Sequence, residues 1–131
     1  PYLGSLIAKA RVKGFQGDNF NDASTVLACV KHYAAYGAAQ AGRDYHTVDM
    51  SERVLRDIYL PPYKAAIDAG AYTVMTSFNE YDGVPATGNS FLLRNVLRDE
   101  WGFNGLVVTD YTSINEMVPH GIVANEREAG E

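Results

Sequence analysis

The stretch GLVVTDY, residues 105–111, contains the pattern on which the fold prediction rests. Its apolar part, Leu106 to Val108, is typical of a strand buried on both faces, as strands of a parallel sheet are. Asp110 ends this strand and Tyr111 comes next. An aspartate at the end of a buried strand either caps the following helix or projects into a functional site. Its position alone leaves both interpretations open.

Two other stretches have the same organisation, an apolar strand that gives way to polar residues. Residues 24–33, STVLACVKHY, end in Lys31 and His32, and residues 71–78, AYTVMTSF, lead into Asn79. Both contain the β-branched residues that strands favour. Helical patterns alternate with the strands along the chain. We expect these helices over residues 2–15, 51–60, 63–70 and 91–103, and from residue 114 onward.

Two sequence signals bear on the helix boundaries in the middle of the chain. Asp49, with Glu52 three residues later, resembles a capping box, so we expect Asp49 to begin the helix. The double proline Pro61-Pro62 cannot continue a helix interior. It predicts a break after residue 60, followed by a restart with proline in the first turn.

The alternation of helices and strands predicts a parallel sheet with crossover helices, in a doubly wound sheet or a (β/α) barrel. No glycine-rich phosphate loop follows a strand, which disfavours the nucleotide-binding sheet. A complete barrel needs about 250 residues, and this chain has 131. We therefore predict an α/β fold, a segment of a (β/α)8 TIM-like barrel of about three βα units. Its parallel strands are 24–33, 71–78 and 105–110, and residues 1–131 form part of one catalytic domain.

The composition argues against several classes of function. The formal net charge is −5 and no basic cluster is present, which argues against nucleic acid or a membrane surface as partner. Cys29 is the only cysteine, so a disulfide within the chain is impossible. The three histidines, at positions 32, 46 and 120, lack metal-ligand spacing. We predict no metal site and no cofactor.

The carboxyl ends of parallel strands meet on one rim, where sites of α/β proteins form. We therefore expect Lys31, His32 and Asp110 to share a polar pocket. A cation such as Lys31 would keep Asp110 ionised, as a nucleophile in carbohydrate chemistry must be. Lys31 and His32 would both donate hydrogen bonds to sugar hydroxyls. Because neighbouring strand residues point to opposite faces, this requires the strand to end or bulge there.

Other residues of this rim allow both a functional and a structural interpretation. Tyr111 suits stacking on a sugar and equally suits packing. Met75 is more commonly core filler than a ligand contact. Asp44 and His46 have the spacing of an acid–base pair, but local hydrogen bonds within a polar loop are the commoner role.

Two long stretches of the sequence closely resemble the β-glucosidases of glycoside hydrolase family 3. They are KHYAAYGAAQAGRDYHTVDMSERVLRDIYLPPYKAAI, residues 31–67, and VMTSFNEYDGVPATGNSFLLRNVLRDEWGFNGLVVTDY, residues 74–111. The resemblance extends over essentially the whole chain, and its last residues fit the bacterial periplasmic branch. It implies a retaining hydrolase of terminal β-D-glucosyl residues, periplasmic or secreted, with a β-glucoside or oligosaccharide as substrate. It also implies the remainder of a longer enzyme as partner, with an oligomer allowed.

The resemblance also implies the site residues. Asp110 falls on the nucleophile, Lys31 and His32 on the sugar-binding Lys-His pair, and Tyr111 on the aromatic after the nucleophile. The Met-x-Ser-Phe/Tyr motif places Met75 and Phe78 at the sugar. Upstream sugar-binding residues and the acid/base glutamate, in a later domain, are expected outside this chain. Glu80, Asp82 and Glu116 are not assigned that role. The isolated segment should therefore show little or no turnover.

Four alternatives remain open at this point. The chain after Lys31-His32 lacks the pattern of the β-N-acetylglucosaminidase branch, which disfavours that activity and a catalytic role for His46. A β-xylosidase of the same family differs only in substrate. A Schiff-base lyase would use Lys31 as its nucleophile. A non-catalytic carbohydrate-binding segment would bind sugar without Asp110.

Overall fold

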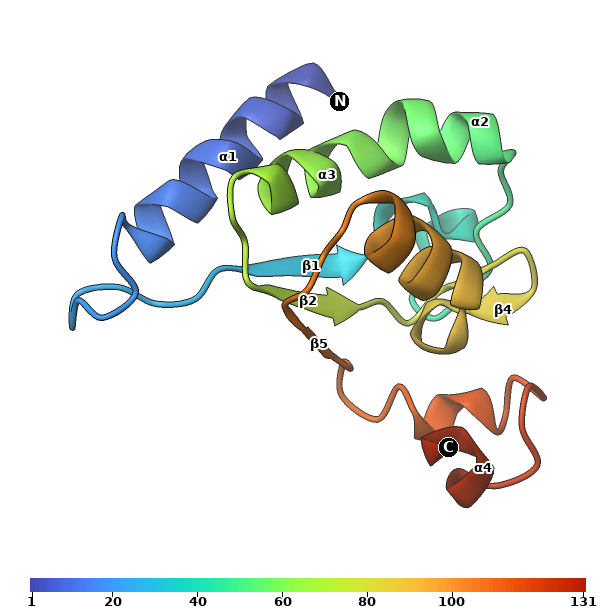
Figure 1. The fold of residues 1–131 in the computed structure, drawn as a ribbon. Coiled ribbons are helices and arrows are strands. Elements are labelled where there is room, and N and C mark those ends of the chain that lie inside the picture. The colour runs from blue at the N-terminus through green and yellow to red at the C-terminus, as the bar shows by residue number, and fades with distance from the viewer.

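The computed structural model describes residues 1–131 and contains one parallel sheet of three strands (Figure 1). The strands are β1 (Cys29–Tyr33), β2 (Thr73–Thr76) and β5 (Leu106–Val108), in the order β1-β2-β5. Both pairings are parallel, with Cys29 opposite Thr73 and Thr73 opposite Leu106. Strands that follow one another in the sheet as they do in the chain are what a barrel segment requires. The predicted α/β fold is confirmed.

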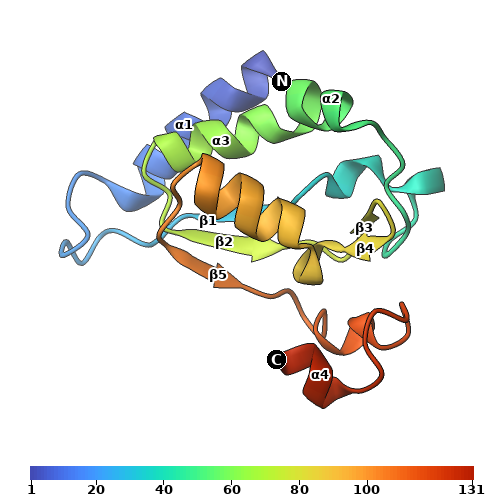
Figure 2. The ribbon, with the colours of Figure 1, turned by 45° about the vertical axis from the view of Figure 1, so that its right-hand side comes forward.

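The helices lie together on one face of this sheet, as Figures 1 and 2 show. They are α1 (Tyr2–Gln16), a continuous helical stretch from Glu52 to Asp68, and a helical segment over Phe91–Glu100. Alternate strand residues turn toward these helices and are buried: Val30 on β1 and Val74 on β2. Leu92, Val96 and Leu97 of the last helix are fully buried in the same core.

The opposite face of the sheet is uncovered. Leu106 is 60% exposed and Val108 is 37% exposed, although both are large apolar residues of β5. Cys29 and Lys31 of β1 are also exposed. Because strand side chains alternate, these residues share the face that looks away from the helices. In a barrel this face would be the interior.

The middle helix begins and bends differently from the prediction. Ser51 is its cap, with its Oγ accepting a hydrogen bond from the amide of Val54 at 3.3 Å, so the expected cap at Asp49 is wrong. Its first turn is α2 (Glu52–Val54), followed by a π-helical turn over Leu55–Tyr59. α3 (Leu60–Asp68) then restarts with both prolines in its first turn, as predicted. The expected break is thus a widened turn and not an interruption.

The remaining elements are shorter than predicted. The strand expected from residue 24 starts only at Cys29, because the Asp22 carboxylate accepts from the amide and hydroxyl of Ser24 and folds that stretch into a turn.

The expected turn 79–89 contains a hairpin of β3 (Glu80–Tyr81) and β4 (Val84–Pro85). Its two central residues, Asp82 and Gly83, have φ of 54° and 77°, as a tight hairpin requires.

The helix expected from residue 114, with an interruption at Pro119 and Gly121, forms only as short pieces. It has a single 3-10 turn over Asn115–Met117 and ends in α4 (Glu126–Gly130). Gly121 has φ of 75° and, with Pro119, interrupts the helical pattern between them. No helix in the structure is both long and apolar enough to cross a bilayer.

Glycine is required at the first position of GLVVTDY. A Cβ on Gly105 would lie 2.2 Å from the backbone oxygen of Tyr72. The next residue, Leu106, donates its amide to that same oxygen at 3.0 Å and so begins the β2–β5 pairing. Gly105 therefore permits the close approach with which β5 enters the sheet.

The amino ends of the strands are joined by one buried side chain, Gln16 at the end of α1. Its Nε2 donates to the Gly70 oxygen at 2.8 Å, and its Oε1 accepts from the amides of Ala28 at 3.1 Å and Tyr72 at 3.2 Å. Gln16 is 4% exposed. It therefore links α1 to the segments that lead into β1 and β2.

Gln16→Ala should lower the free energy of unfolding by about 2–3 kcal/mol, because three backbone groups lose their partner in a buried place. Urea unfolding followed by the fluorescence of Trp101, the only tryptophan, measures the change. Gln40→Ala, at an exposed position, is the control and should change the free energy by less than about 0.5 kcal/mol. Equal effects of the two substitutions would contradict the role given to Gln16.

Candidate active site

The candidate site lies where the carboxyl ends of β1 and β5 approach each other. The Nε2 atom of His32, on β1, is 3.2 Å from Oδ2 of Asp110, two residues past β5. The two side chains are 28% and 17% exposed. A carboxylate and an imidazole thus meet across the end of β2, partly shielded from solvent and still accessible to a ligand.

Asp110 does not act as a helix cap. Its Oδ1 accepts from the amide of Tyr111 at 2.7 Å, and its backbone oxygen accepts from the amide of Ser113 at 3.2 Å. The next helical turn begins after Ile114. The local bonds therefore hold Asp110 in a turn and leave Oδ2 directed at His32.

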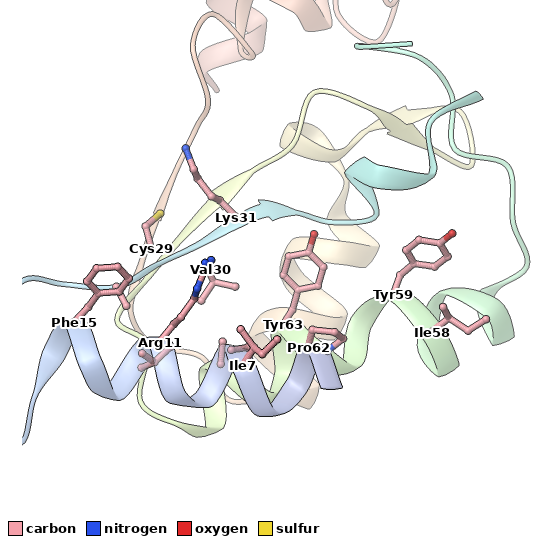
Figure 3. Close-up of a pocket in the computed structure, with 15 residues that line it drawn as sticks. Ile7, Arg11, Phe15, Cys29, Val30, Lys31, Ile58, Tyr59, Pro62 and Tyr63 are labelled. Atoms are coloured by element: carbon pink, nitrogen blue, oxygen red, sulfur yellow. The ribbon is translucent and has the colours of Figure 1, made fainter. Parts of the chain in front are cut away.

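Lys31 and His32 diverge at the end of β1. The β1–β2 register shifts between Val30 and Tyr33, which is the irregularity that the sequence required. Lys31 is exposed on the open face of the sheet and forms no ion pair, so the partner of Asp110 is His32 and not Lys31. Figure 3 shows Lys31 pointing away from the helices, on the same side of β1 as Cys29.

Met75, Phe78 and Tyr111 lie at different depths around the rim. Met75 is half-buried on β2, in register with Val108 of β5. Phe78 packs on Tyr45, with ring centroids 4.4 Å apart. Tyr111 is 81% exposed, so its ring is free to meet a ligand.

The loop after β1 adds two tyrosines, Tyr36 and Tyr45, that the sequence did not place at the site. The Tyr36 ring lies 5.1 Å from His32 and 6.3 Å from Phe78, measured between ring centroids. Asp44 accepts from the Tyr36 hydroxyl and, at 3.0 Å, from the amide of Tyr45. The pKa of Tyr36 is raised to about 12, mainly by burial and secondly by the hydrogen bond to Asp44. The clue in the sequence was the density of tyrosines between residues 33 and 45.

These hydrogen bonds agree with the interpretation that Asp44 stabilises its own loop and is not part of an acid–base pair with His46. Its carboxylate is occupied by bonds within its own loop, whereas His46 is exposed and forms no ion pair. Two of the other acidic residues considered, Glu80 and Asp82, are also accounted for outside the site. Glu80 accepts from the Thr47 hydroxyl and lies 3.7 Å from Nδ1 of His120, and Asp82 is exposed in the hairpin turn.

No group of three or more His, Cys, Asp or Glu side chains in the structure is arranged to hold a metal ion. The rim instead combines one accessible carboxylate, an imidazole, an amine and aromatic rings. Such a set is suited to a polyhydroxylated ligand, since donors orient hydroxyl groups and aromatic rings stack on sugar faces.

Asp44→Ala should loosen the rim loop, because it removes the acceptor of both Tyr36 and Tyr45. We expect the amide of Tyr45 to exchange with solvent deuterium about tenfold faster, as measured by hydrogen exchange. His46→Ala, two residues away in the same loop, is the matched control and should leave the rate unchanged. Unaltered exchange in Asp44→Ala would show that Asp44 does not order the loop.

Comparison with known proteins places these features in a family. The Glycosyl hydrolase family 3 N terminal domain matches residues 1–130. A periplasmic beta-glucosidase of Salmonella typhimurium is 48% identical over 98% of this chain and 17% of its own length. A beta-xylosidase of Formosa agariphila is 39% identical over 98% of this chain and 18% of its own length.

A solved structure gives the same result for the fold. The crystal structure of beta-glucosidase from Listeria innocua in complex with isofagomine superposes with a TM-score of 0.96 at 51% identity, covering 98% of this chain and 18% of that one. The chain thus spans less than a fifth of the length of these relatives. With the family match extending over residues 1–130, the chain belongs to glycoside hydrolase family 3, within the N-terminal domain of that family.

Proposed function

We propose that this chain is part of a retaining β-glucosidase in which Asp110 is the nucleophile. The observation that carries the proposal is the 3.2 Å contact between His32 and Asp110 at the ends of two barrel-type strands. It leaves an ionisable carboxylate accessible on the rim where sites of this architecture form. The relatives from Salmonella typhimurium and Listeria innocua, both named as beta-glucosidases, support the same activity.

The chemistry assigns Asp110 one half of a two-carboxylate reaction. Its Oδ atom attacks the anomeric carbon, the glycosidic bond breaks, and water then releases the sugar from the covalent ester. A second carboxyl group about 5–5.5 Å away must protonate the leaving oxygen and later activate water. By family resemblance that group belongs to another domain, so we expect the segment alone to have little turnover.

The remaining site residues would bind the sugar. Lys31 and His32 would donate to its hydroxyl groups, and the His32 ring would also keep Asp110 oriented. Met75 and Phe78 would line the pocket, and the exposed Tyr111 ring would form a wall. Phe78 lacks the hydroxyl that the family often has at this position, so one contact near the nucleophile is missing.

The uncovered surfaces of the segment support its place inside a larger barrel. Leu106 and Val108 are exposed on the open sheet face, where opposite barrel strands would pack. A mostly apolar groove of about 570 Å³ lies between α1, α3 and β1, on the helix side of the sheet (Figure 3). It does not contain His32 or Asp110, and a further βα unit beside β1 would cover it.

The substrate and compartment follow from the named relatives. Structures of the Listeria innocua enzyme were solved with glucose and, for a D270A mutant, with laminaribiose. We accordingly propose a β-linked glucoside or short glucan as substrate. The periplasmic relative supports a periplasmic or secreted location.

The nucleophile can be tested in the longer protein that carries this chain. A 2-deoxy-2-fluoro-glucoside should form a covalent adduct on Asp110, found by peptide mass spectrometry, because the fluorine slows release of the ester. Asp110→Ala should lower kcat by about 10⁴-fold, the loss typical of a removed nucleophile. The control Asp82→Ala, at an exposed hairpin position, should leave kcat within about twofold. An adduct on any other residue would overturn the assignment.

Lys31 separates the glucosidase from a Schiff-base lyase. In the proposed role Lys31 only donates to hydroxyl groups, so borohydride in the presence of sugar should neither inactivate the longer protein nor modify Lys31. Lys31→Met should lower kcat/KM for a β-glucoside by about 10²-fold, the loss of a charged hydrogen bond. Reductive trapping of a carbonyl compound on Lys31 would instead establish the lyase.

A further inference from the structure

The hydroxyl of Tyr63 reaches from the helix layer to the backbone of the site. It donates to the carbonyl oxygen of His32 at 2.6 Å. Tyr63 lies on α3, and Figure 3 shows its side chain extending from that helix toward the end of β1. One phenol therefore ties α3 to the backbone of His32 near the end of β1.

The two carbonyl groups that follow His32 accept hydrogen bonds from residues just after β2. The amide of Ser77 donates to the Tyr33 oxygen at 2.8 Å, and its Oγ donates to the Ala34 oxygen at 3.2 Å. Nδ2 of Asn79 donates to the same Ala34 oxygen at 3.2 Å. Ser77 and Asn79 are both 0% exposed. Three consecutive carbonyls are thus fixed by groups shielded from water.

The backbone that follows β1 adopts an unfavourable conformation at Ala35. Ala35 has φ of 63°, a left-handed conformation that is unfavourable for a residue with a Cβ. Tyr33 is fully buried, donates its hydroxyl to the Leu92 oxygen at 2.9 Å and packs edge-on against Tyr63 at 5.4 Å between centroids. The packing and the hydrogen bonds together keep the backbone of His32 in one position.

We propose that Tyr63 and Ser77 are positioning residues for catalysis, acting through the backbone of His32. Neither residue is hydrogen-bonded to Asp110 in the structure, but together they hold the carbonyl groups of His32, Tyr33 and Ala34. The His32 ring is 3.2 Å from Asp110, so a small displacement of this backbone changes the orientation of the nucleophile. The inference rests on the proposed glucosidase function, because it needs Asp110 as the reacting group.

The test compares two tyrosines of the same helical stretch in the longer protein. Tyr63→Phe removes only the hydroxyl that holds His32. Tyr59→Phe is the matched control, since Tyr59 lies one turn earlier, lines the same groove and forms no hydrogen bond through its hydroxyl in the structure. The readouts are the rate of covalent labelling by the 2-fluoro-glucoside, kcat and KM for a β-glucoside, and the thermal midpoint.

Tyr63→Phe should slow labelling and lower kcat about tenfold or more, because misplacement of a reacting group costs rate more than binding. KM should change by less than about threefold, and Tyr59→Phe should resemble the unaltered protein in every readout. Ser77→Ala should reproduce the fall in labelling rate, and it decides the question if Tyr63→Phe does not fold.

Labelling and turnover within twofold of the unaltered protein, in Tyr63→Phe or in a folded Ser77→Ala, would overturn the inference. So would an equal loss in Tyr59→Phe, which would indicate general destabilisation of the helix. The two hypotheses fail separately. Absence of any adduct on Asp110 in the unaltered protein would contradict the glucosidase function. A normal adduct in the unaltered protein, together with variants that are labelled at the same rate, would contradict only the positioning role.

Discussion

The parallel register of β1, β2 and β5 is the constraint on which the site depends. Parallel strands end at the same edge, so residues separated by nearly eighty positions in the chain meet there. His32 and Asp110 approach within 3.2 Å because each lies at the carboxyl end of its own strand and β2 holds the two strands at a fixed spacing. Reversing the direction of β1 or of β5 would send one of the two residues to the opposite edge.

Buried polar groups fix the sheet at both ends, and they do so by different means. At the amino ends, the amide of Gln16 satisfies three backbone groups and holds α1 to the strands. At the carboxyl ends, Tyr63 satisfies the carbonyl of His32 on β1 and Ser77 that of Ala34 just after β1. Both arrangements use side chains to pair backbone groups that no strand reaches, since an unpaired buried group is costly. The backbone of the rim is therefore held by buried side chains at His32, whereas Tyr111, which follows Asp110, is exposed.

The uncovered sheet face and the function that we propose both depend on the surroundings that a barrel provides. Leu106 and Val108 lie exposed because a barrel interior is formed by strands from all around its circumference. The reaction that we propose would likewise need a second carboxyl group, which we expect from another domain. In that proposal the three strands carry the nucleophile Asp110 and part of the sugar pocket, and the remaining groups come from outside the segment.

Much of the architecture was predictable because its signals are local. The apolar runs of the strands, the proline restart at Pro61 and the polar residues after each strand depend on near neighbours in sequence, although Leu106 and Val108, expected to be buried, are exposed. Several boundaries were not. Ser51 and not Asp49 caps its helix, and the Asp22 turn shortens the first strand, because short hydrogen-bonding side chains compete for the same backbone amides.

By itself, the sequence determined the parallel α/β fold and the residues that stand at the strand ends, among them Asp110. Only the tertiary structure decided which of them meet. It paired Asp110 with His32 and not with Lys31, brought Tyr36 and Tyr45 to the rim, and set Tyr63 beneath His32. The physical reason is that side-chain direction depends on a register shift and on packing between distant elements, and neither is encoded in the spacing of residues along one strand.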